Sequence, residues 1–299
     1  ASGVMDLSAG SIVSLCGVLT ALALHGGMGI WASVLTGIAA GGLMGALNGV
    51  LIHCTGINFF VLTLASSGML RGISLMITDG KPITKFGKEF MQLGIGRIGE
   101  FQVPVLFALA LILLSFPLMF HVKWGNYVRA LGGSESALKR SGVRTGFYRI
   151  SVHMLLGITA AVTAVIITAR LNSAEPNAGM NMELDAITAV IMGGTPIRGG
   201  NASIAGTVLA VLILGSIRNG LTLLSVSSDF QQWITGFLLL ASVLISEIYH
   251  SNSQRLRRQY HEKIFNSFID SRIYCSGIDR VQRLRRRKGN FCYGNYCSC

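Results

Sequence analysis

"GIAAGGLMGALNG" occupies Gly37–Gly49 and repeats glycine at every fourth position: Gly37, Gly41, Gly45 and Gly49. Residues four apart lie on one face of an α-helix, so these glycines would form one nearly smooth stripe. In a bilayer, a stripe of small residues lets another backbone approach closely. We expect the stripe to pack against another helix of the same chain, and a contact with a second subunit is the alternative.

Long apolar stretches dominate the rest of the chain. Of its 299 residues, 51% are hydrophobic and only 13% are charged, whereas a soluble domain carries about 25% charge. Stretches of roughly 18–25 uncharged residues can cross a hydrocarbon core of about 30 Å. We therefore predict an all-α, polytopic integral membrane protein with about seven spanning helices: Leu7–Leu24, Met28–Ile52, Ile57–Thr78, Phe101–Phe120, Ile150–Leu171, Ala202–Leu224 and Phe230–Tyr249.

One further apolar piece, Asp185–Gly194, is too short to span and is typical of a re-entrant or broken helix. The turn after it is rich in glycine, which allows a sharp reversal of the chain. The residues predicted for this re-entrant turn are Gly193, Gly194, Gly199 and Gly200.

Loop charges predict the orientation. The segment Lys123–Arg149 carries six Lys or Arg and one Glu, whereas Asn172–Asp185 carries three acids and no base. By the positive-inside rule the first segment is cytoplasmic and the second lies outside. By the same alternation the loop Asp79–Glu100 falls outside, although it carries slightly more base than acid.

The chain changes character near Tyr249. Residues 1–249 carry a net charge of +4 and form the predicted transmembrane domain, with a cytoplasmic segment at 121–149. Residues 250–299 carry +8 and have no sustained apolar pattern. We predict a basic cytoplasmic tail that is disordered or lies outside the natural reading frame. Its four cysteines lack the paired spacing of a zinc site, so no metal is predicted.

The basic segment contains a short helix signal in "GGSESALKRSG", Gly132–Gly142. Ser134 can cap a helix and Glu135 suits its first turn. Lys139 and Arg140 suit the last turn, and Gly142 supplies the stop. A helix of about two turns is unstable alone in water, so we expect it to dock on a partner. Small residues around it, among them Ala130 and Ala137, permit a close approach, and we expect Gly125, Gly132 and Gly133 to make tight bends. A basic loop on anionic lipid is the alternative.

Polar residues are few in the spans. Asp6 precedes the first span and resembles a helix N-cap, while the acids Asp79, Asp185, Asp229 and Glu247 map to span ends. Arg71 and Arg218 fall in the outer thirds of spans, where snorkelling is expected and path lining is the alternative. Neutral hydroxyls and amides suit a polyol better than an ion, although each can bond its own helix instead. The translocation-path candidates are Asp6, Asn48, Asn58, Thr63 and Asn219.

Signatures of catalysis are missing. No G-x-x-x-x-G-K-[ST] phosphate loop, H-E-x-x-H or G-x-S-x-G pattern occurs, and the six His are scattered. We therefore predict no catalytic residue, no enzymatic activity and no cofactor bound by this chain, so that any ATP and magnesium would bind a separate subunit.

Several long motifs resemble one family, in the same order. The segment from Gly125 to Val143 resembles the cytoplasmic coupling segment of bacterial ABC-importer permeases for monosaccharides, the ribose/xylose/galactose group. "MDLSAGSIVSLCGV", "NGVLIHCTGINFFVLTLASSGMLRGI" and the run Glu183–Leu224 resemble three further family segments. Asn58 stands where many members have Pro, and Ala202 replaces a common Gly. Members usually have further spans before the D-L-S motif, so we expect an N-terminal truncation.

The resemblance implies a sugar permease in the bacterial inner membrane, with its C-terminus in the cytoplasm. The implied partners are a second permease subunit, in a homodimer or heterodimer, cytoplasmic ATP-binding subunits, a periplasmic sugar-binding protein and membrane lipid; no nucleic-acid partner is predicted. The ATPase-coupling residues would be Gly125, Asn126, Ala130, Gly132, Ser134, Glu135, Ala137 and Gly142. Alternatives are the same build importing another small solute, such as a sugar-derived autoinducer, and an ATP-independent carrier or channel.

Overall fold

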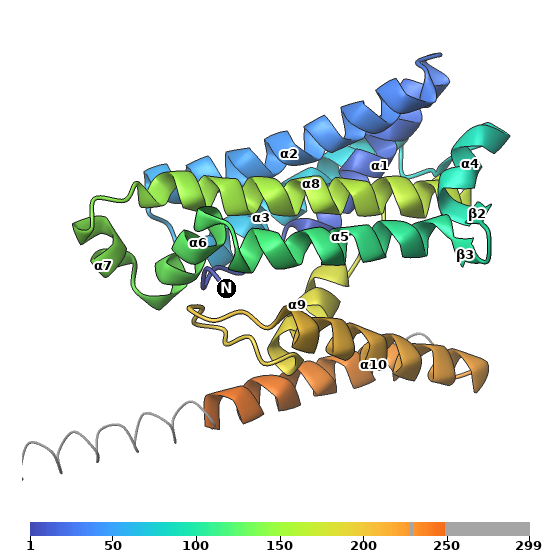
Figure 1. The fold of residues 1–299 in the computed structure, drawn as a ribbon. Coiled ribbons are helices and arrows are strands. Elements are labelled where there is room, and N and C mark those ends of the chain that lie inside the picture. Colours follow the sequence, from blue (N-terminus) through green and yellow to red (C-terminus); the bar gives the residue numbers. More distant parts are fainter. Residues whose placement is uncertain (228–229, 249–299) are drawn as a thin grey trace, which may run out of the picture. The chain divides into compact units, whose positions relative to one another are not determined.

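The computed structural model describes residues 1–227 and 230–248, which are mostly helical (Figure 1). Residues Ala1–Val243 form one compact unit. Tyr249 and the predicted tail, with Cys275, Cys292, Cys297 and Cys299, lie outside the described residues. The described elements are α1 (Ala9–His25), α2 (Ile30–Thr55), α3 (Phe59–Thr78), β1 (Ile83–Thr84), α4 (Lys88–Ile95), β2 (Arg97–Ile98), β3 (Phe101–Gln102), α5 (Val103–Phe120), α6 (Lys123–Gly133), α7 (Glu135–Arg140), α8 (Thr145–Leu171), β4 (Ser173–Ala174), α9 (Met182–Met192), α10 (Ile204–Leu223) and the helix Phe230–Ile248.

The predicted fold class, an all-α polytopic membrane protein, is confirmed. Six described helices are long and apolar enough to cross a membrane: α2, α3, α5, α8, α10 and Phe230–Ile248. The remaining predicted span, Leu7–Leu24, corresponds to α1, which has 17 residues and is buried along most of its length. The predicted short piece at Asp185–Gly194 is α9, whose 11 residues are too few to span.

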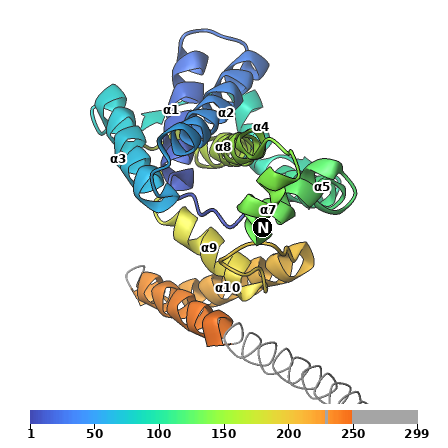
Figure 2. The ribbon, with the colours of Figure 1, turned by 90° about the vertical axis from the view of Figure 1, so that its left-hand side faces the viewer.

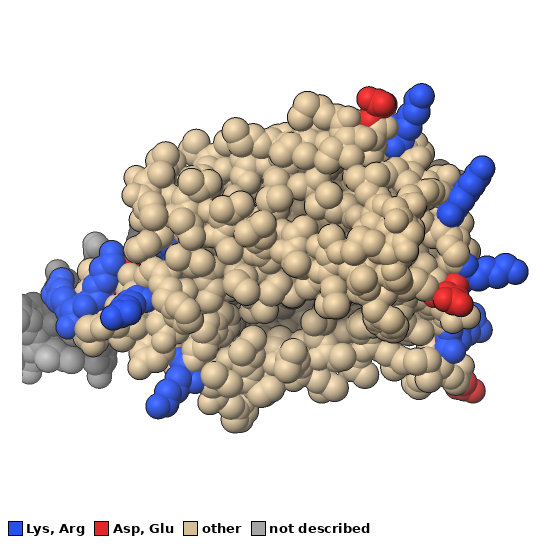
Figure 3. All heavy atoms as spheres, turned by 90° about the horizontal axis from the view of Figure 1, so that it is seen from above, with Lys and Arg blue, Asp and Glu red and all other residues tan. Residues whose placement is uncertain are grey.

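The surface has the distribution expected of a membrane protein. On the face drawn in Figure 3, Lys, Arg, Asp and Glu gather at two ends, and the broad region between them is nearly free of charge. Large apolar side chains are exposed along the spans, among them Leu35 on α2, Met69 on α3 and Leu113 on α5. Lipid is the medium in which such surfaces are stable.

Helix α8 is the centre of the main bundle. In the end-on view of Figure 2, α1 and α2 lie on one side of it and α5 on the other. Its buried positions are mostly small: Gly157, Ala160, Ala161, Ala164 and Ala169. Because small side chains leave the helix surface flat, neighbouring helices can approach α8 closely along much of its length.

The glycine stripe of α2 lies against α8. A methyl group added to Gly41 would stand 2.6 Å from Cβ of Ala161, and one added to Gly49 would stand 2.7 Å from Cα of Ile150. At Gly45 the added carbon would collide with the backbone carbonyl of His153. Gly37, at the start of the stripe, meets Thr20 of α1 instead. The stripe therefore packs inside this chain, which is the first of the two expected arrangements.

Short elements close one end of the bundle. The predicted loop Asp79–Glu100 contains α4, which packs on α8 where Gly94 meets the backbone of Ala169 and Arg170. Strand β1 pairs antiparallel with β4, Ile83 opposite Ala174. The side-chain oxygen of Asn172, the residue that ends α8, accepts a hydrogen bond from the Phe86 backbone at 3.1 Å. This end is thus tied to α8 through close backbone contact at Gly94 and through the Asn172 side chain.

Helices α9 and α10 form a close pair joined by the predicted glycine turn. A side chain on Gly193 would stand 2.5 Å from the Thr207 nitrogen, so the two helices touch at backbone level. Positive φ angles occur at Gly194 (86°), Gly199 (78°) and Gly200 (88°), a conformation that favours glycine. The turn contacts the start of the chain, where the Gly200 N–H donates to the Ala1 carbonyl at 2.8 Å.

We predict that Gly45→Ala destabilises the protein while Gly72→Ala does not. The added methyl of Gly45→Ala meets backbone atoms of α8, which can move only if the helices separate, at a cost of about 1–3 kcal/mol. Gly72 on α3 has nothing within 4 Å of the added carbon, so alanine there is neutral or stabilising by up to about 1 kcal/mol. Thermal unfolding in detergent measures both, and equal shifts in melting temperature would contradict the close contact.

Candidate functional site

The basic segment between α5 and α8 folds as two helices, and the short helix predicted there forms as α7. The Ser134 hydroxyl accepts from the Ala137 backbone N–H at 3.3 Å and caps its start. Its end is closed by Gly142, which has a φ of 78° and donates its N–H to the Lys139 carbonyl at 3.0 Å. The side chains of Asn126, Ala130 and Ala137 are exposed on this segment.

The prediction that glycines make bends around α7 is wrong, because Gly125, Gly132 and Gly133 lie inside α6. They allow close approach instead. A side chain on Gly125 would stand 2.5 Å from the Leu118 carbonyl oxygen at the end of α5. One on Gly132 would stand 3.0 Å from Cα of Gly199, in the turn between α9 and α10. The basic segment therefore touches the glycine turn between α9 and α10 directly.

Glu135 holds α7 to α8. Its carboxylate lies 2.6 Å from the Arg149 guanidinium of α8 and 2.9 Å from the Lys139 ammonium one turn away. Partial burial raises the pKa of Glu135, but the hydrogen bonds and charges of Lys139 and Arg149 outweigh it and lower the pKa below its ordinary value. The stabilisation from this charge is therefore complete above the unfolded pKa of about 4.3 and is lost as the pH falls through the lower, folded value.

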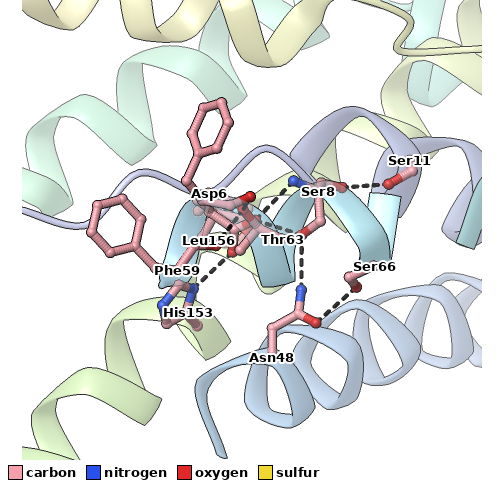
Figure 4. Close-up of polar contacts among 11 residues, drawn as sticks. Asp6, Ser8, Ser11, Asn48, Phe59, Thr63, Ser66, His153 and Leu156 are labelled. Carbon is pink, nitrogen blue, oxygen red and sulfur yellow. Dashed lines mark hydrogen bonds and ion pairs between the residues drawn. The ribbon is translucent and has the colours of Figure 1, made fainter. Parts of the chain in front are cut away.

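A buried polar network joins α1, α2, α3 and α8 (Figure 4). Asp6 contacts Nδ1 of His153 at 2.7 Å through one oxygen and accepts from the Ser8 N–H and hydroxyl, at 2.8 and 2.5 Å, through the other. Asn48 donates to the Ser8 hydroxyl at 2.9 Å and accepts from Ser66 at 2.8 Å. The Ser8 hydroxyl bonds both Asp6 and Asn48, so the structure brings these two predicted path residues together. Ser8 itself is not among the predicted path residues.

Asp6 does not act as the N-cap of α1, contrary to the prediction. That helix begins at Ala9, and Asp6 accepts from the N–H of Ser8, which is two residues on and still outside the helix. This is the bonding of an Asx turn rather than of a cap. The turn directs the carboxylate toward α8, where His153 is 2% exposed and its Nε2 atom has no hydrogen-bond partner.

The other path candidates make no hydrogen bond to this network, although Thr63 lies beside it in Figure 4. Thr63 is fully buried, and its hydroxyl donates to the Phe59 carbonyl of its own helix at 2.8 Å. Asn58 is exposed and caps α3 by accepting from the Phe60 N–H at 2.9 Å. Asn219 is exposed on α10. Thr63 thus bonds within its own helix, which is the alternative role expected for hydroxyl groups in the spans.

Arg71 and Arg218, for which snorkelling is expected from the sequence, both bind protein groups. Arg71 of α3 donates to the carbonyls of Pro176 and Ala178, at 3.3 and 3.0 Å, and so fixes the segment before α9. Arg218 of α10 forms a bidentate ion pair with Asp185 of α9. Each terminal guanidinium nitrogen donates to one carboxylate oxygen at 2.9 Å. Sequence spacing carries no signal for either pair, since the partners are 33 or more residues apart.

Metal chemistry finds no support in the described ranges 1–227 and 230–248. Those residues contain no group of three or more His, Cys, Asp or Glu side chains that could hold an ion. Of the two described cysteines, Cys16 is buried in the core and Cys54 is exposed.

We predict that the Asp6–His153 pair is a strongly coupled unit. Replacing one member, as in His153→Leu, leaves a buried carboxylate without its partner and costs about 3–5 kcal/mol. Ser11→Ala is the control, because the Ser11 hydroxyl bonds only the Ser8 carbonyl within the same turn. A double-mutant cycle of Asp6→Asn with His153→Leu, read by thermal unfolding in detergent, gives the coupling energy. Additive losses would contradict a direct pair.

Comparison with known proteins gives the family. The family described as "Branched-chain amino acid transport system / permease component" matches residues 1–243. The ribose import permease protein of Escherichia coli (strain K12) is 37% identical over 245 residues, covering 81% of this chain and 76% of that protein. The D-allose transport system permease protein of the same strain is 36% identical over 245 residues (82% and 75%).

The L-arabinose transport system permease protein of that strain is 31% identical over 244 residues (82% and 74%). No solved structure matches the chain. Taken with the apolar spanning helices, the match over residues 1–243 has one consequence: the chain is a multi-pass membrane protein that belongs to the branched-chain amino acid transport system / permease component family.

Proposed function

We propose that this chain is the transmembrane subunit of an ATP-binding-cassette importer that moves a monosaccharide inward across the bacterial inner membrane. The observation that carries the proposal is its similarity, over four-fifths of the chain, to permeases named for ribose, D-allose and L-arabinose. The chain has no phosphate loop, so ATP and magnesium bind a separate subunit.

The ATPase subunit docks on α7, which lies on the cytoplasmic side. Two features support this assignment. The segment around α7 is strongly basic, and its capped helix is only six residues long and exposes two small side chains, Ser136 and Ala137. The loop segments at the opposite end of α8 then face a sugar-binding protein outside the membrane. A second permease subunit completes the pathway, and the C-terminus is cytoplasmic.

The contacts of α7 offer a route from the ATPase to the interior. Glu135 of α7 holds Arg149, and His153 lies four residues further along α8, on the same face. His153 in turn holds Asp6 at the start of α1. A movement of α7 therefore acts on the buried network through one turn of α8. It also acts on the α9–α10 turn through Gly132 and Gly199.

Reconstitution in vesicles tests the proposed function. The permease, assembled with its ATPase and binding protein, is expected to take up labelled ribose, D-allose or L-arabinose only when ATP is present. Uptake without ATP or without the ATPase subunit would instead indicate a carrier or channel. Uptake of a branched-chain amino acid or of another small solute, with no sugar uptake, would overturn the proposed substrate class.

We predict that Ala137→Arg uncouples transport from ATP hydrolysis. Ala137 is exposed on α7, so the arginine leaves the fold intact and obstructs only the docking contact. A clash at the centre of an interface typically costs several kcal/mol, which corresponds to a loss of more than about a hundredfold in ATP-driven uptake. Thr55→Arg is the matched control, because Thr55 is exposed at the nearby end of α2 and lies outside α7. Equal uptake by both variants would contradict docking on α7.

A further inference from the structure

A polar cavity lies among α9, α10 and the helix Phe230–Ile248. Its volume is about 380 Å³. It adjoins a more apolar cavity of about 310 Å³ between the same three helices, and Asp185 and Arg218 line both. The polar cavity is also lined by Asn181, Thr188, Gln231, Gln232 and Thr235. This concentration of polar groups stands out in a region whose helices otherwise expose Leu, Ile and Val.

The Asp185–Arg218 pair is accessible rather than sealed. The Asp185 side chain is 30% exposed and that of Arg218 is 52% exposed. A charged pair on apolar helices is costly where it faces hydrocarbon, so such residues face a water-filled cavity or a protein partner. This face of α9 and α10 is therefore suited to line an aqueous path.

The chemistry of the cavity fits a polyhydroxylated ligand. The Asp185 carboxylate accepts hydrogen bonds, and the Arg218 guanidinium donates them. Gln232 contributes an amide, which can do both and has no hydrogen-bond partner among the described residues. A sugar hydroxyl also does both, so adjacent hydroxyls can bridge such groups. The apolar cavity next to them, with Ala186 and Leu214 in its lining, offers a wall for the C–H face of a sugar ring.

The position within the fold fits a station on the path. Helix α10 starts beside the glycine turn that touches α6 and runs toward the end of the bundle that carries α4 (Figure 1). Arg218 lies in the second half of α10, and Asp185 lies in the first turn of α9. Both are therefore placed away from the coupling segment, on the side from which an importer receives its substrate.

We propose that Asp185, Arg218 and Gln232 form a monosaccharide-binding station at which the permease holds sugar in transit. The station rests on the proposed function, because a sugar-binding site of this kind requires that the permease carries sugar. A ligand is held there by hydroxyl contacts to the carboxylate, the guanidinium and the amide, and it leaves when the helices that line the cavity separate.

The test measures labelled ribose taken up per ATP hydrolysed by the permease assembled with its ATPase and binding protein in vesicles. Asp185→Asn removes the charge and Gln232→Leu removes the amide. Each is expected to lower uptake per ATP about tenfold, which matches the loss of a hydrogen bond to a charged or polar ligand group. ATP hydrolysis stimulated by the loaded binding protein should stay within about twofold of the parent rate. The melting temperature should stay within a few degrees of the parent value.

Gln92→Leu on α4 is the matched control, since it makes the same change at an exposed residue outside the cavity. If Asp185→Asn fails to assemble, Gln232→Leu decides, because Gln232 makes no contact that the fold requires. Ribose uptake per ATP equal to the parent in Gln232→Leu would overturn the station while leaving the proposed function intact. If these variants abolish uptake of labelled leucine but not ribose, the assignment to a sugar is overturned. No ATP-dependent sugar uptake by the parent would overturn the proposed function itself.

Discussion

The contact between the glycine stripe of α2 and the middle of α8 is the constraint on which the rest of the structure depends. Gly45 lies against the carbonyl of His153, and Gly49 lies against Cβ of the same residue. Asn48 is on α2 between these two glycines. Because the backbones meet here, His153 and Asn48 can both reach the segment at the start of α1, His153 through Asp6 and Asn48 through Ser8. Larger residues on the stripe would separate the helices and open the network.

This arrangement ties the buried network to the end of the bundle that carries α7. Helix α8 carries both Arg149, which binds α7, and His153, which binds Asp6. Helices α9 and α10 touch each other at backbone level, and the glycine turn between them touches α6 at the same end. The fold therefore places the short helix α7, the buried polar network and the short helix α9 within reach of one another.

Features set by local sequence could be predicted. The apolar stretches predicted the spans, the spacing of four predicted the stripe on α2, and Ser134 and Gly142 predicted where α7 starts and ends. Features set by distant contacts could not. His153 looked like one of several scattered histidines, and Asp185–Arg218 joins residues 33 apart. Glycine serves both in turns and where two backbones approach closely, so the sequence alone does not distinguish these roles for the α6 glycines. The backbone of the α9–α10 turn beside Gly132 decides for close approach.

The most direct test of this account is a double-mutant cycle between Gly45→Ala on α2 and His153→Leu on α8, read by thermal unfolding in detergent. If the glycine contact holds His153 against Asp6, the two substitutions disrupt the same interaction. The double variant then loses less unfolding free energy than the two single variants together, by about 1 kcal/mol or more. The same cycle with Gly72→Ala, on the open face of α3, should be additive. Additive losses for Gly45→Ala and His153→Leu would contradict the dependence of the buried network on the α2–α8 contact.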